Sequence, residues 1–443
     1  MENILNLFSD DVIVAPATPT GRSALAIIRS TGKNVFEIFQ SALRCEPHIV
    51  NAKANRAIVV SFETGDFCDK AVALIYRSPK SYTGENMVEF SVHGNPTIVR
   101  KIIDALISNG ARLANPGEFT FRAAMNGKMN IVDAEAISAT IQSQTERALA
   151  AVKRATAGIA EIARSKSLIH NTLIEIAAAL EFSEDELPRE NAQKWIDDAT
   201  LAMNMIKAFL EKIRFSRRLF TGITVVVAGE PNAGKSTLFN RIVGAERAIV
   251  TPHPGTTRDI IEATVEISGV PMTILDTAGL RDVDHPIEEE GVRRAERAIE
   301  NADAVIWMID GAGKSSMPPP FENSIVVLNK SDIGISQKLW KEFPKAIAIS
   351  ALTGEGFGEL MRCLQEKIAD IPSDAVMISA RTENVFCQTA DELSTVIDAM
   401  QKDFWDVAQV SLERADNMLE SLFSLANPGD IYDEIFSKFC IGK

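Results

Sequence analysis

The sequence predicts a multidomain fold of α/β and α parts: an α+β N-terminal domain, an α-helical bundle, and an α/β domain inserted into the bundle. Three observations predict it. The chain has 443 residues, enough for about three domains of ~150 residues each. Its hydrophobic pattern changes twice, from short strand-like runs to alanine-rich helical sequence and then to alternating strands and helices. Helical sequence stands on both sides of the alternating region, and an insertion explains this because the ends of a compact domain often lie close together.

The first segment, residues 1–120, combines strand-like runs with one clear helix. Short apolar runs predict strands at 58–62, 71–76 and 87–92. Residues 97–110 have apolar residues at helical spacing and end at a glycine, which predicts a helix. We therefore expect an α+β domain in this segment.

The remaining chain divides at two changes of pattern. Residues 121–217 are alanine-rich and have helical periodicity, which predicts the first part of a helical domain. Residues 218–373 open with the buried-strand run ITVVVAG and alternate strands with helices, and residues 374–443 are mainly helical again. Within the first helical part, one stripe at helical spacing consists of Leu201, Met205, Phe209 and Ile213.

Composition argues against several classes of protein. The net charge of -14 disfavours binding of nucleic acid over most of the surface, because phosphate contact requires Lys and Arg. No apolar stretch approaches the ~18 residues of a membrane helix, and the first twenty residues lack the Lys and Arg of a secretory or mitochondrial leader. The five cysteines form no C-x-x-C pair, so neither a zinc knuckle nor a disulfide framework is indicated. We expect a cytoplasmic protein without a membrane partner.

A local basic surface remains open as an alternative. Lys and Arg residues gather on two segments predicted to be helical: Arg147, Lys153, Arg154, Arg164, Lys166, Lys212, Arg214, Arg217 and Arg218. Nucleic-acid contact is one interpretation. A solvated helix face is the commoner origin of such a cluster.

Residues 229–236, GEPNAGKS, match the phosphate-binding motif G-x-x-x-x-G-K-[ST]. The motif follows a strand-like run and precedes a helical segment, which is the context it requires. Its glycines let backbone N–H groups close on phosphate oxygens, while Lys235 reaches the β- and γ-phosphates and Ser236 offers its hydroxyl to Mg²⁺. The expected nucleotide contacts in this loop are Asn232, Ala233, Gly234, Lys235, Ser236 and Thr237.

Two further segments complete the predicted phosphate and metal site. The run PMTILD ends at Asp276, whose carboxylate is placed for Mg²⁺, and the following glycine amide is placed for the γ-phosphate. The segment GTTRD supplies Thr257 for a switch that closes over Mg²⁺. The expected contacts here are Gly255, Thr256, Thr257, Asp276, Thr277, Ala278 and Gly279.

Base selection is predicted for two loops. Asn329-Lys330-Ser331-Asp332 follows the strand-like run SIVVLN, and a carboxylate there can accept both N–H donors of a guanine edge, a pair that adenine lacks. Ser350-Ala351-Leu352 fits the last base-contacting loop. The expected base contacts are Asn329, Lys330, Asp332, Ser350, Ala351 and Leu352. Five motifs in this order predict a Ras-like P-loop G domain that binds GTP.

Leu280 departs from the Ras-like pattern. It stands where a glutamine would orient the attacking water, so hydrolysis must use another group. Glu288, Glu289 and Glu290 in the acidic segment 287–301 are candidates. Periodicity alone makes them more typical of a solvated helix face.

Nearly the whole chain resembles the MnmE/TrmE family of tRNA-modification GTPases. The resemblance includes segments outside the G domain: TPTGRSALAIIR at 18–29, SYTGENMVEFSVHGNP at 81–96, NPGEFTFRAAMNGKMNIVDAEA at 115–136 and FCIGK at 439–443. GEFTFRA and the terminal CIGK are specific to that family, whereas the G-domain motifs are shared by many GTPases. The resemblance therefore bears on the whole chain.

For the N-terminal domain, the resemblance implies binding of a tetrahydrofolate derivative, 5-formyl- or methylene-tetrahydrofolate, and a constitutive homodimer. The folate contacts carry over to Arg29, Glu89, Lys128 and Lys443. These charges suit the anionic glutamate tail and the pterin edge of a folate. Cys440 carries over as a catalytic residue near the folate.

For GTP hydrolysis, the resemblance implies activation by G-domain dimerisation, with a potassium ion in place of an arginine finger. Lys235 and Glu288 carry over as catalytic residues, Glu288 by positioning water. The switch stretch adds nucleotide contacts at Thr251, Pro252, His253 and Pro254, and the potassium ligands carry over to Asn232, Thr251, His253 and Thr256. His253 contributes at most a backbone contact.

The reaction implied by the resemblance is the modification of certain tRNAs at carbon 5 of the wobble uridine, position 34. The family works with MnmG/GidA, a flavoprotein that carries FAD, in a heterotetramer or larger complex. An aminomethyl or carboxymethylaminomethyl group is added, with the folate as one-carbon donor. GTP turnover then drives a conformational change and is not the chemical step on the base.

Two alternatives differ in class. A ribosome-assembly GTPase with unrelated flanking domains would share the G-domain motifs, but would be favoured by a KH-like module or a second P-loop, and the sequence has neither signal. A folate-dependent one-carbon transferase with a merely regulatory GTPase is the other. Deletion of FCIGK separates the activities: GTP hydrolysis should persist while tRNA modification disappears.

Overall fold

The computed structural model describes residues 11–182, 189–249, 261–276, 297–313, 319, 324–423, 432, 435–439 and 441–442. The chain divides into two compact units. Unit 1 comprises Met1–Ser138, Leu173–Ser183 and Asp398–Lys443, and unit 2 comprises Ala139–Thr172 and Glu184–Ile397. Each unit is described by itself.

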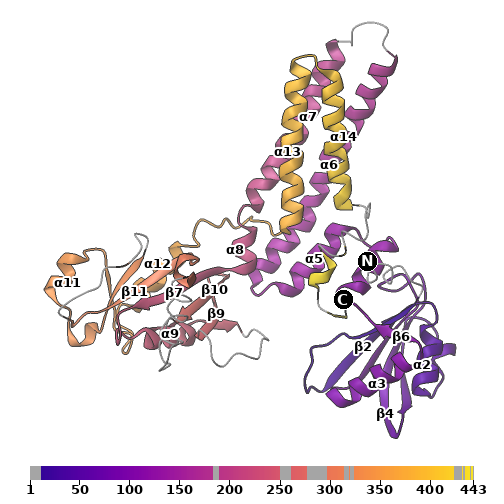
Figure 1. The fold of residues 1–443 in the computed structure, drawn as a ribbon, viewed down its shortest axis with the longest axis horizontal. Coiled ribbons are helices and arrows are strands. Elements are labelled where there is room, and N and C mark those ends of the chain that lie inside the picture. Colours follow the sequence, from indigo (N-terminus) through magenta and orange to yellow (C-terminus); the bar gives the residue numbers. More distant parts are fainter. Residues whose placement is uncertain are drawn as a thin grey trace. The chain divides into compact units, whose positions relative to one another are not determined.

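Unit 1 contains a six-stranded mixed sheet (Figure 1). Its strands are β1 (Val12–Pro16), β2 (Leu25–Thr31), β3 (Arg56–Thr64), β4 (Phe67–Tyr76), β5 (Met87–His93) and β6 (Ala111–Leu113). Their order is β3-β4-β5-β2-β1-β6, and all neighbours are antiparallel except the parallel pair β1–β6. The strands predicted at 58–62, 71–76 and 87–92 are confirmed as the cores of β3, β4 and β5.

The core of this sheet lies on one face. Helices α2 (Val35–Leu43) and α3 (Pro96–Ser108) and the short 3-10 helix η1 (Ile49–Asn51) supply its outer layer. Phe39 and Phe62 both pack edge-on against Phe90, with ring centroids 5.6 and 5.4 Å apart. Alternation in β3 and β4 places these apolar side chains inward, as a half-buried strand requires. The predicted α+β domain and its helix at 97–110 are thereby confirmed.

Two short helices continue unit 1 and meet the end of the chain. They are α4 (Glu118–Met125) and α5 (Ile131–Gln142), while α14 (Trp405–Phe423) and the 3-10 helix η4 (Phe436–Lys438) come from the C-terminal part. Phe121 of α4 packs edge-on against Tyr432 and Phe436 at 5.2 and 5.3 Å between centroids. Gly117 has φ +68°, and a Cβ there would lie 2.5 Å from the Phe436 carbonyl oxygen. Only glycine fits this close approach.

A network of charged side chains is centred on Glu118, the first residue of α4. Glu118 is fully buried and accepts from Arg112 at 2.6 Å and from Arg122 at 3.0 Å. Asp11 binds both arginines, at 2.5 and 2.6 Å, and Glu85 lies 3.4 Å from Arg122. Burial disfavours the charged form of Arg112, but its bonds to Glu118 and Asp11 outweigh this and raise its pKa. These charges are therefore paired, as buried charges must be.

Unit 2 contains a seven-stranded sheet of the P-loop α/β type. Its strands are β7 (Ile223–Gly229), β8 (Arg247–Ile249), β9 (Ile261–Ile267), β10 (Val270–Asp276), β11 (Ala304–Asp310), β12 (Ile325–Asn329) and β13 (Ile347–Ala348). The order is β13-β12-β11-β7-β10-β9-β8, parallel except for β9 against β10 and β8 against β9. The connecting helical elements include α9 (Lys235–Ala245), η3 (Ser331–Ile333), α11 (Gln337–Glu342) and α12 (Phe357–Glu366). A Ras-like α/β domain is thus present where it was predicted.

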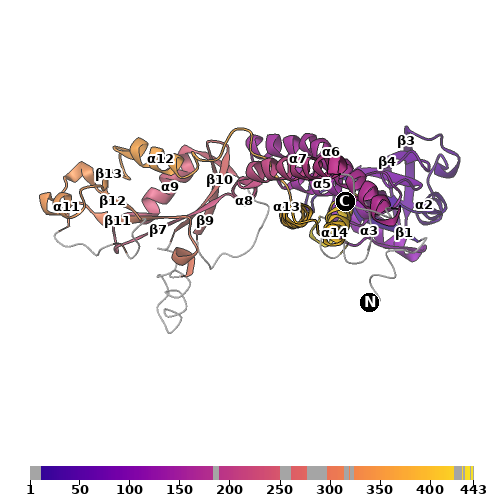
Figure 2. The same ribbon diagram turned by 90° about the horizontal axis from the view of Figure 1, so that it is seen from above.

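The helical part of unit 2 is built from long segments that stand before and after the G domain in the chain. They are α6 (Glu146–Phe182), which continues into unit 1, α7 (Arg189–Ile213), α8 (Ser216–Thr221) and α13 (Ala380–Gln401), whose last residues also belong to unit 1. Figure 2 shows α6 and α7 side by side. Phe209 of α7 lies 5.5 Å from the ring of Phe386 in α13, and a Cβ on Gly158 of α6 would fall 2.4 Å from the Phe209 ring.

The stripe of Leu201, Met205, Phe209 and Ile213 lies on α7, as helical spacing predicts, but only part of it is buried. Phe209 and Ile213 are buried, but Leu201 is 44% exposed and Met205 is only partly buried. The inner positions belong to Ala202 and Ile206 instead. At 3.6 residues per turn, steps of four residues drift by about 40° each, so such a stripe leaves the buried face. The observed spacing of four, three and four residues stays on it.

The entry and exit of the G domain lie together, as an insertion requires. The Val376 N–H donates to the Lys212 carbonyl at 3.0 Å, and the Ser216 hydroxyl donates to the Val376 carbonyl at 2.6 Å. Arg154 of α6 donates to the Ala375 carbonyl at 3.0 Å. The two connecting segments are thus adjacent in space although they are about 160 residues apart, the separation of Ser216 and Val376.

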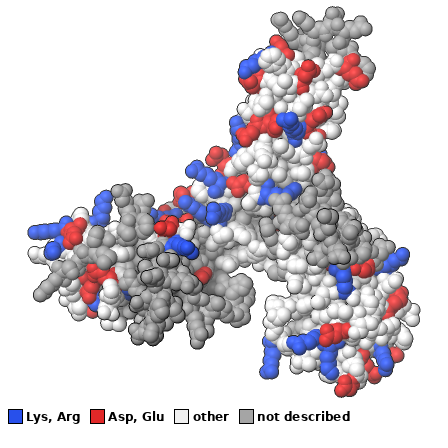
Figure 3. Space-filling view, in the orientation of Figure 1, with Lys and Arg blue, Asp and Glu red and all other residues white. Residues whose placement is uncertain are grey.

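Several of the clustered basic residues have structural partners. Arg147 donates to the carbonyls of Ser268 and Ile371, and Arg154 to that of Ala375. Arg218 pairs with Asp370 at 3.0 Å. On the face in Figure 3, Lys and Arg side chains are interspersed with Asp and Glu. Among the described helices, none is both long and apolar enough to cross a membrane.

Candidate functional site

The phosphate-binding motif forms the turn between β7 and α9. Gly229, Asn232 and Gly234 have φ values of +134°, +59° and +94°. A Cβ on Gly229 would lie 2.1 Å from the Met308 carbonyl oxygen, and one on Gly234 would lie 2.3 Å from Asn329 Nδ2. Both glycines are therefore required by backbone conformation and by close neighbours.

Lys235 begins α9 and is 7% exposed. Its ammonium donates to the Glu230 carbonyl at 2.8 Å and approaches that of Gly229 at 3.4 Å. Ser236 and Thr237 follow in the exposed first turn of α9. The amine, the glycine turn and the N-terminus of an eleven-residue helix together provide the donors that a phosphate group needs.

Asp276 lies beside this loop in the sheet. It is the last residue of β10 and is fully buried, and β10 pairs with β7 so that Asp276 is opposite Val227. The carboxyl ends of parallel strands share one edge, where α/β proteins bind their ligands. A carboxylate at that edge fits a hard divalent cation such as Mg²⁺.

The other predicted members of the phosphate and metal site lie outside the described residues. They are Thr251, Pro252, His253, Pro254, Gly255, Thr256, Thr257, Thr277, Ala278 and Gly279, together with Leu280 and Glu288 to Glu290. The expected switch threonine and catalytic glutamate therefore remain predictions.

Asn329 connects the two predicted base loops to the phosphate loop. It ends β12 and is 3% exposed. Its Nδ2 donates to the Ala233 carbonyl at 2.7 Å, and its Oδ1 accepts from the Ala351 N–H at 2.8 Å. One side chain thus joins all three loops through main-chain groups.

The other residues of the two base loops differ in their exposure and in their contacts. Lys330 has φ +68° and pairs with Asp310 at 2.5 Å, whereas Asp332 is exposed in η3. Ser350 and Ala351 are buried and Leu352 is 74% exposed. An accessible Asp332 beside a rigid loop suits recognition of a base edge by a carboxylate.

In unit 1, the structure brings Arg29 and Glu89 together. They are directly opposite in the β2–β5 ladder, and Arg29 donates to Glu89 Oε1 at 2.7 and 3.0 Å. Arg29 Nη1 also donates to the Gly442 carbonyl at 3.0 Å, which places Gly442 at this pair. Tyr76 donates to Glu89 Oε2 at 3.3 Å.

Aromatic side chains border the Arg29 guanidinium. It lies 5.5 Å from the centroid of Tyr82 and 5.8 Å from that of Phe119. Burial raises the pKa of Tyr76, as does the neighbouring Glu89 charge, and burial also raises the pKa of Tyr82. Both phenols therefore stay protonated and can donate at neutral pH. A carboxylate, a guanidinium and flat rings in one place fit a planar heterocycle with an anionic tail.

Lys128 has a different contact. Its ammonium donates to the Pro79 carbonyl at 3.0 Å, and Asn126 Nδ2 donates to the Thr83 carbonyl at 2.7 Å. The loop that contains Pro79 and Thr83 also carries Tyr82, so it connects the Lys128 side of the domain to the rings around Arg29. No hydrogen bond or ion pair found in the described residues joins Lys128 directly to Arg29 or Glu89.

The terminal residues are only partly described. Cys440 and Lys443 lie outside the described residues, whereas the glycine between them, Gly442, is buried. Its φ is +94°, and a Cβ would lie 2.4 Å from the Pro16 carbonyl oxygen. Glycine is therefore required here by its φ and its neighbour.

Tyr76, Tyr82 and Phe119 were not among the residues predicted for this site. Tyr82 and Phe119 belong to SYTGEN and GEFTF, parts of the segments that carry the family resemblance, but only the charged residues Glu89 and Lys128 were predicted from those segments. Tyr76 ends a predicted strand. Strand alternation places Leu74 and Tyr76 on the same side as Glu89, because the register pairs Leu74 with Glu89.

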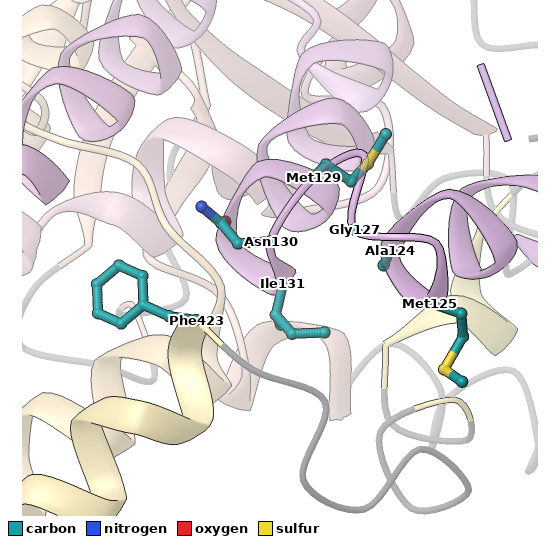
Figure 4. Close-up of a pocket in the computed structure, with 7 residues that line it drawn as sticks. All are labelled: Ala124, Met125, Gly127, Met129, Asn130, Ile131 and Phe423. Carbon is teal, nitrogen blue, oxygen red and sulfur yellow. The ribbon is translucent and has the colours of Figure 1, made fainter. Parts of the chain in front are cut away.

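A cavity of about 530 Å³ lies next to Lys128 in the chain (Figure 4). Its lining is Ala124, Met125, Gly127, Met129, Asn130, Ile131 and Phe423. In the view shown, Ile131 lies between Phe423 and Met125. Most of these side chains are apolar, but the cavity also exposes polar atoms, so its lining does not indicate one class of ligand.

Two family profiles match the chain. Residues 12–128 match a family described as the N-terminus of the GTP-binding protein TrmE. Residues 224–335 match one described as a 50S ribosome-binding GTPase. The two matches cover the sheet of unit 1 and most of the G domain.

Full-length relatives share both regions. A tRNA modification GTPase MnmE from Thermus thermophilus is 34% identical over 98% of this chain and 99% of its own. Proteins of that name from Aquifex aeolicus and Thermotoga maritima are 34% and 35% identical over 97% and 98% of this chain, and over 99% and 100% of their own. Among solved structures, a variant of Era from Aquifex aeolicus bound to GDP and AlF4- is 26% identical over 38% of this chain and 66% of its own, with a TM-score of 0.26. That TM-score is too low to support an argument.

Proposed function

This chain belongs to the MnmE family of tRNA modification GTPases, and we propose that it modifies carbon 5 of the wobble uridine, position 34, in certain tRNAs. The group added is aminomethyl or carboxymethylaminomethyl. A flavoprotein of the MnmG/GidA type, which carries FAD, is the partner, and a folate supplies the one-carbon unit. The family assignment removes the alternative of a ribosome-assembly GTPase with unrelated flanking domains.

The observation that carries this proposal is the contact between Arg29 and Gly442. It joins two segments with family-specific sequence that are 413 residues apart, at a carboxylate–guanidinium pair lined by aromatic rings. Arg29, Glu89 and the terminal Lys443 hold the folate from this side, and Lys128 binds its anionic tail across the Pro79–Thr83 loop. Cys440, two positions before Gly442, is assigned as the catalytic residue near the folate from the family resemblance.

The G domain binds GTP through main-chain donors of the loop 229–236. Lys235 stabilises negative charge on the transferred phosphoryl group, and Asp332 selects guanine. Ser236, Thr257 and Asp276 hold Mg²⁺, which when bound neutralises charge on the β- and γ-phosphate oxygens. The buried Asp276 and the exposed Ser236 hydroxyl beside the glycine turn support this assignment.

Hydrolysis is activated by dimerisation of two G domains. Asn232, Thr251, His253 and Thr256 hold a potassium ion, which when bound supplies the positive charge of an arginine finger, a contribution of roughly 10³- to 10⁵-fold in rate. Asn232 supports this because it is exposed in the phosphate loop, where an ion can reach its side chain. Glu288 orients the water that Leu280 cannot.

Three measurements test the hydrolysis mechanism. Replacement of potassium by sodium should slow turnover strongly, and an equal rate in both salts contradicts the potassium site.

Glu288→Ala should bind GTP normally and lose most turnover, so wild-type hydrolysis by this variant excludes the proposed role of Glu288. In the full-length homodimer, a transition-state analogue should shorten the distance between spin labels on the two G domains only in potassium.

The whole proposal is tested by reconstitution. The protein, the flavoprotein partner, unmodified tRNA, GTP and methylene-tetrahydrofolate are combined with either glycine or ammonium, and tRNA nucleosides are analysed by mass spectrometry. Wild-type protein should produce a modified wobble uridine. Arg29→Ala should abolish the product and leave GTP hydrolysis unchanged. Arg22→Ala, at an exposed position, is the matched control.

Three outcomes would contradict the proposal. Full modification by Arg29→Ala excludes the folate site at Arg29. Absence of any product with wild-type protein, in the presence of measurable GTP hydrolysis, excludes the proposed reaction. A homodimer is expected throughout, and a monomeric mass of the full-length protein by light scattering contradicts it.

A further inference from the structure

Arg241 has no role in any motif, yet it contacts the predicted base loop directly. It lies on α9, six residues after Lys235. Its Nε donates to the Ala351 carbonyl at 2.6 Å and its Nη2 to the Leu352 carbonyl at 2.5 Å. One guanidinium therefore ties the helix that begins at the phosphate loop to two consecutive peptide units of the loop that follows β13.

The loop has a glycine where the guanidinium lies. A Cβ on Gly354 would be 2.6 Å from Arg241 Nη1 and 3.3 Å from Cζ. Gly354 also has φ +93°, and its N–H donates to the Ser350 carbonyl at 2.8 Å. The close turn from Ser350 to Gly354 thus presents its carbonyls to Arg241 and leaves room for the planar fork that Arg provides.

The same loop is held from the other side by Asn329. Its Oδ1 accepts from the Ala351 N–H while its Nδ2 binds the phosphate loop. The N–H and the carbonyl of Ala351 therefore both have fixed partners, one on β12 and one on α9. These two hydrogen bonds together fix the orientation of the segment, because a single bond would still allow the segment to rotate about it.

The orientation matters because a trans peptide unit is planar. When Arg241 draws the Ala351 carbonyl toward α9, the N–H of Leu352 in the same unit points the opposite way. The Thr353 N–H is occupied by the Ser350 hydroxyl at 3.1 Å. Among the hydrogen bonds of the described residues, none uses the Leu352 N–H, so it is available to an external acceptor.

We propose that Arg241 is a positioning residue for guanine recognition. By holding the Ala351 and Leu352 carbonyls, it aims the Leu352 N–H at the O6 acceptor of a guanine nucleoside di- or triphosphate. Adenine carries an amino donor at that position, which a fixed N–H rejects. Arg241 therefore contributes to affinity for GTP and GDP and to discrimination against ATP. This inference rests on the guanine site proposed above.

The test uses full-length protein and fluorescent GDP, GTP and ATP analogues. Arg241→Ala should bind GTP and GDP about tenfold more weakly, equivalent to about 1.4 kcal/mol, with faster dissociation. Its GTP-over-ATP preference should fall, while kcat at saturating GTP stays unchanged. Arg241→Lys keeps the charge but not the two-pronged donor, so it should show part of the same loss. Asn240→Ala, an exposed neighbour on α9, should match wild type.

Several outcomes would overturn the inference. An unchanged GTP affinity excludes a contribution of Arg241. Equal weakening for GTP and ATP indicates a general structural role and contradicts base positioning. If circular dichroism shows that Arg241→Ala is misfolded, Arg241→Lys decides, because it keeps the charge without the two-pronged donor. A folded Arg241→Lys variant with wild-type selectivity rejects the proposal.

Asp332→Asn separates this inference from the guanine site itself. That variant should shift preference from guanine to xanthine nucleotides. Unchanged GTP selectivity in Asp332→Asn means that the proposed guanine site is wrong. A shift to xanthine in Asp332→Asn together with wild-type behaviour of Arg241→Ala means that the site stands and only the role of Arg241 fails.

Discussion

The nucleotide site of unit 2 and the Arg29 site of unit 1 are built from different parts of the polypeptide. The first uses mainly backbone: glycine turns at Gly229 and Gly234 and main-chain groups joined by Asn329. The second uses side chains, with Arg29 and Glu89 on neighbouring strands and aromatic rings from the loop before β5 and from α4. The first is therefore sensitive to backbone conformation, and the second to charge and to the packing that supports it.

The largest effect is expected where a backbone-built site loses a glycine. Gly229→Ala places a Cβ 2.1 Å from the Met308 carbonyl at φ +134°. Strain of about 3 kcal/mol or more should weaken GDP binding by about 100-fold or more, as measured by titration calorimetry. Gly244→Ala is the matched control, since nothing lies within 4 Å of its Cβ. Equal binding by the two variants would break the comparison.

A second effect concerns the charged network that supports unit 1. Arg122→Met removes the buried partner of Glu118 and Asp11, and breaking a buried pair costs about 3 kcal/mol. Scanning calorimetry of the full-length protein should show a lower melting temperature. GDP affinity should be unchanged, because the network is in the other unit. Arg22→Met, at an exposed position, is the control. A variant as stable as this control would show that side-chain pairing does not support the domain.

The smallest effect is expected for the exposed pair Asp69–His93. His93 hydrogen-bonds Asp69 at 2.6 Å and thereby lowers the pKa of Asp69. A lowered carboxyl pKa contributes stability above the unfolded value of about 3.9, and this is lost as the pH falls through the lowered pKa. His93→Ala should therefore cost at most about 1 kcal/mol at pH 6, given solvent screening.

The matching measurement is thermal unfolding of both proteins between pH 2 and 6. Their difference should shrink at the acidic end and in 1 M salt, which screens exposed charges. A difference that is constant across this range would assign the contribution of His93 to packing and not to its bond with Asp69.

Much of the architecture could be predicted because local patterns encode it. The alternation in β3 and β4 and the helical spacing of α3 required only neighbouring residues. Burial on α7 could not be predicted from spacing alone, because Leu201 and Ala202 are adjacent and local spacing does not determine which of them is buried. Farther along α7, Phe209 packs against Phe386 and Gly158, which belong to other helices.

The sequence by itself determined the G-domain motifs, because a phosphate loop needs glycines at fixed spacing wherever the left-handed backbone or a close neighbour requires them. It also determined the insertion, since the change of periodicity lies in the chain itself. Only the tertiary structure decided that Arg29 meets Gly442 and that Arg241 holds the loop after β13. These contacts join residues 413 and 110 positions apart. No local spacing encodes such pairs, because their geometry exists only after the sheets and helices have assembled.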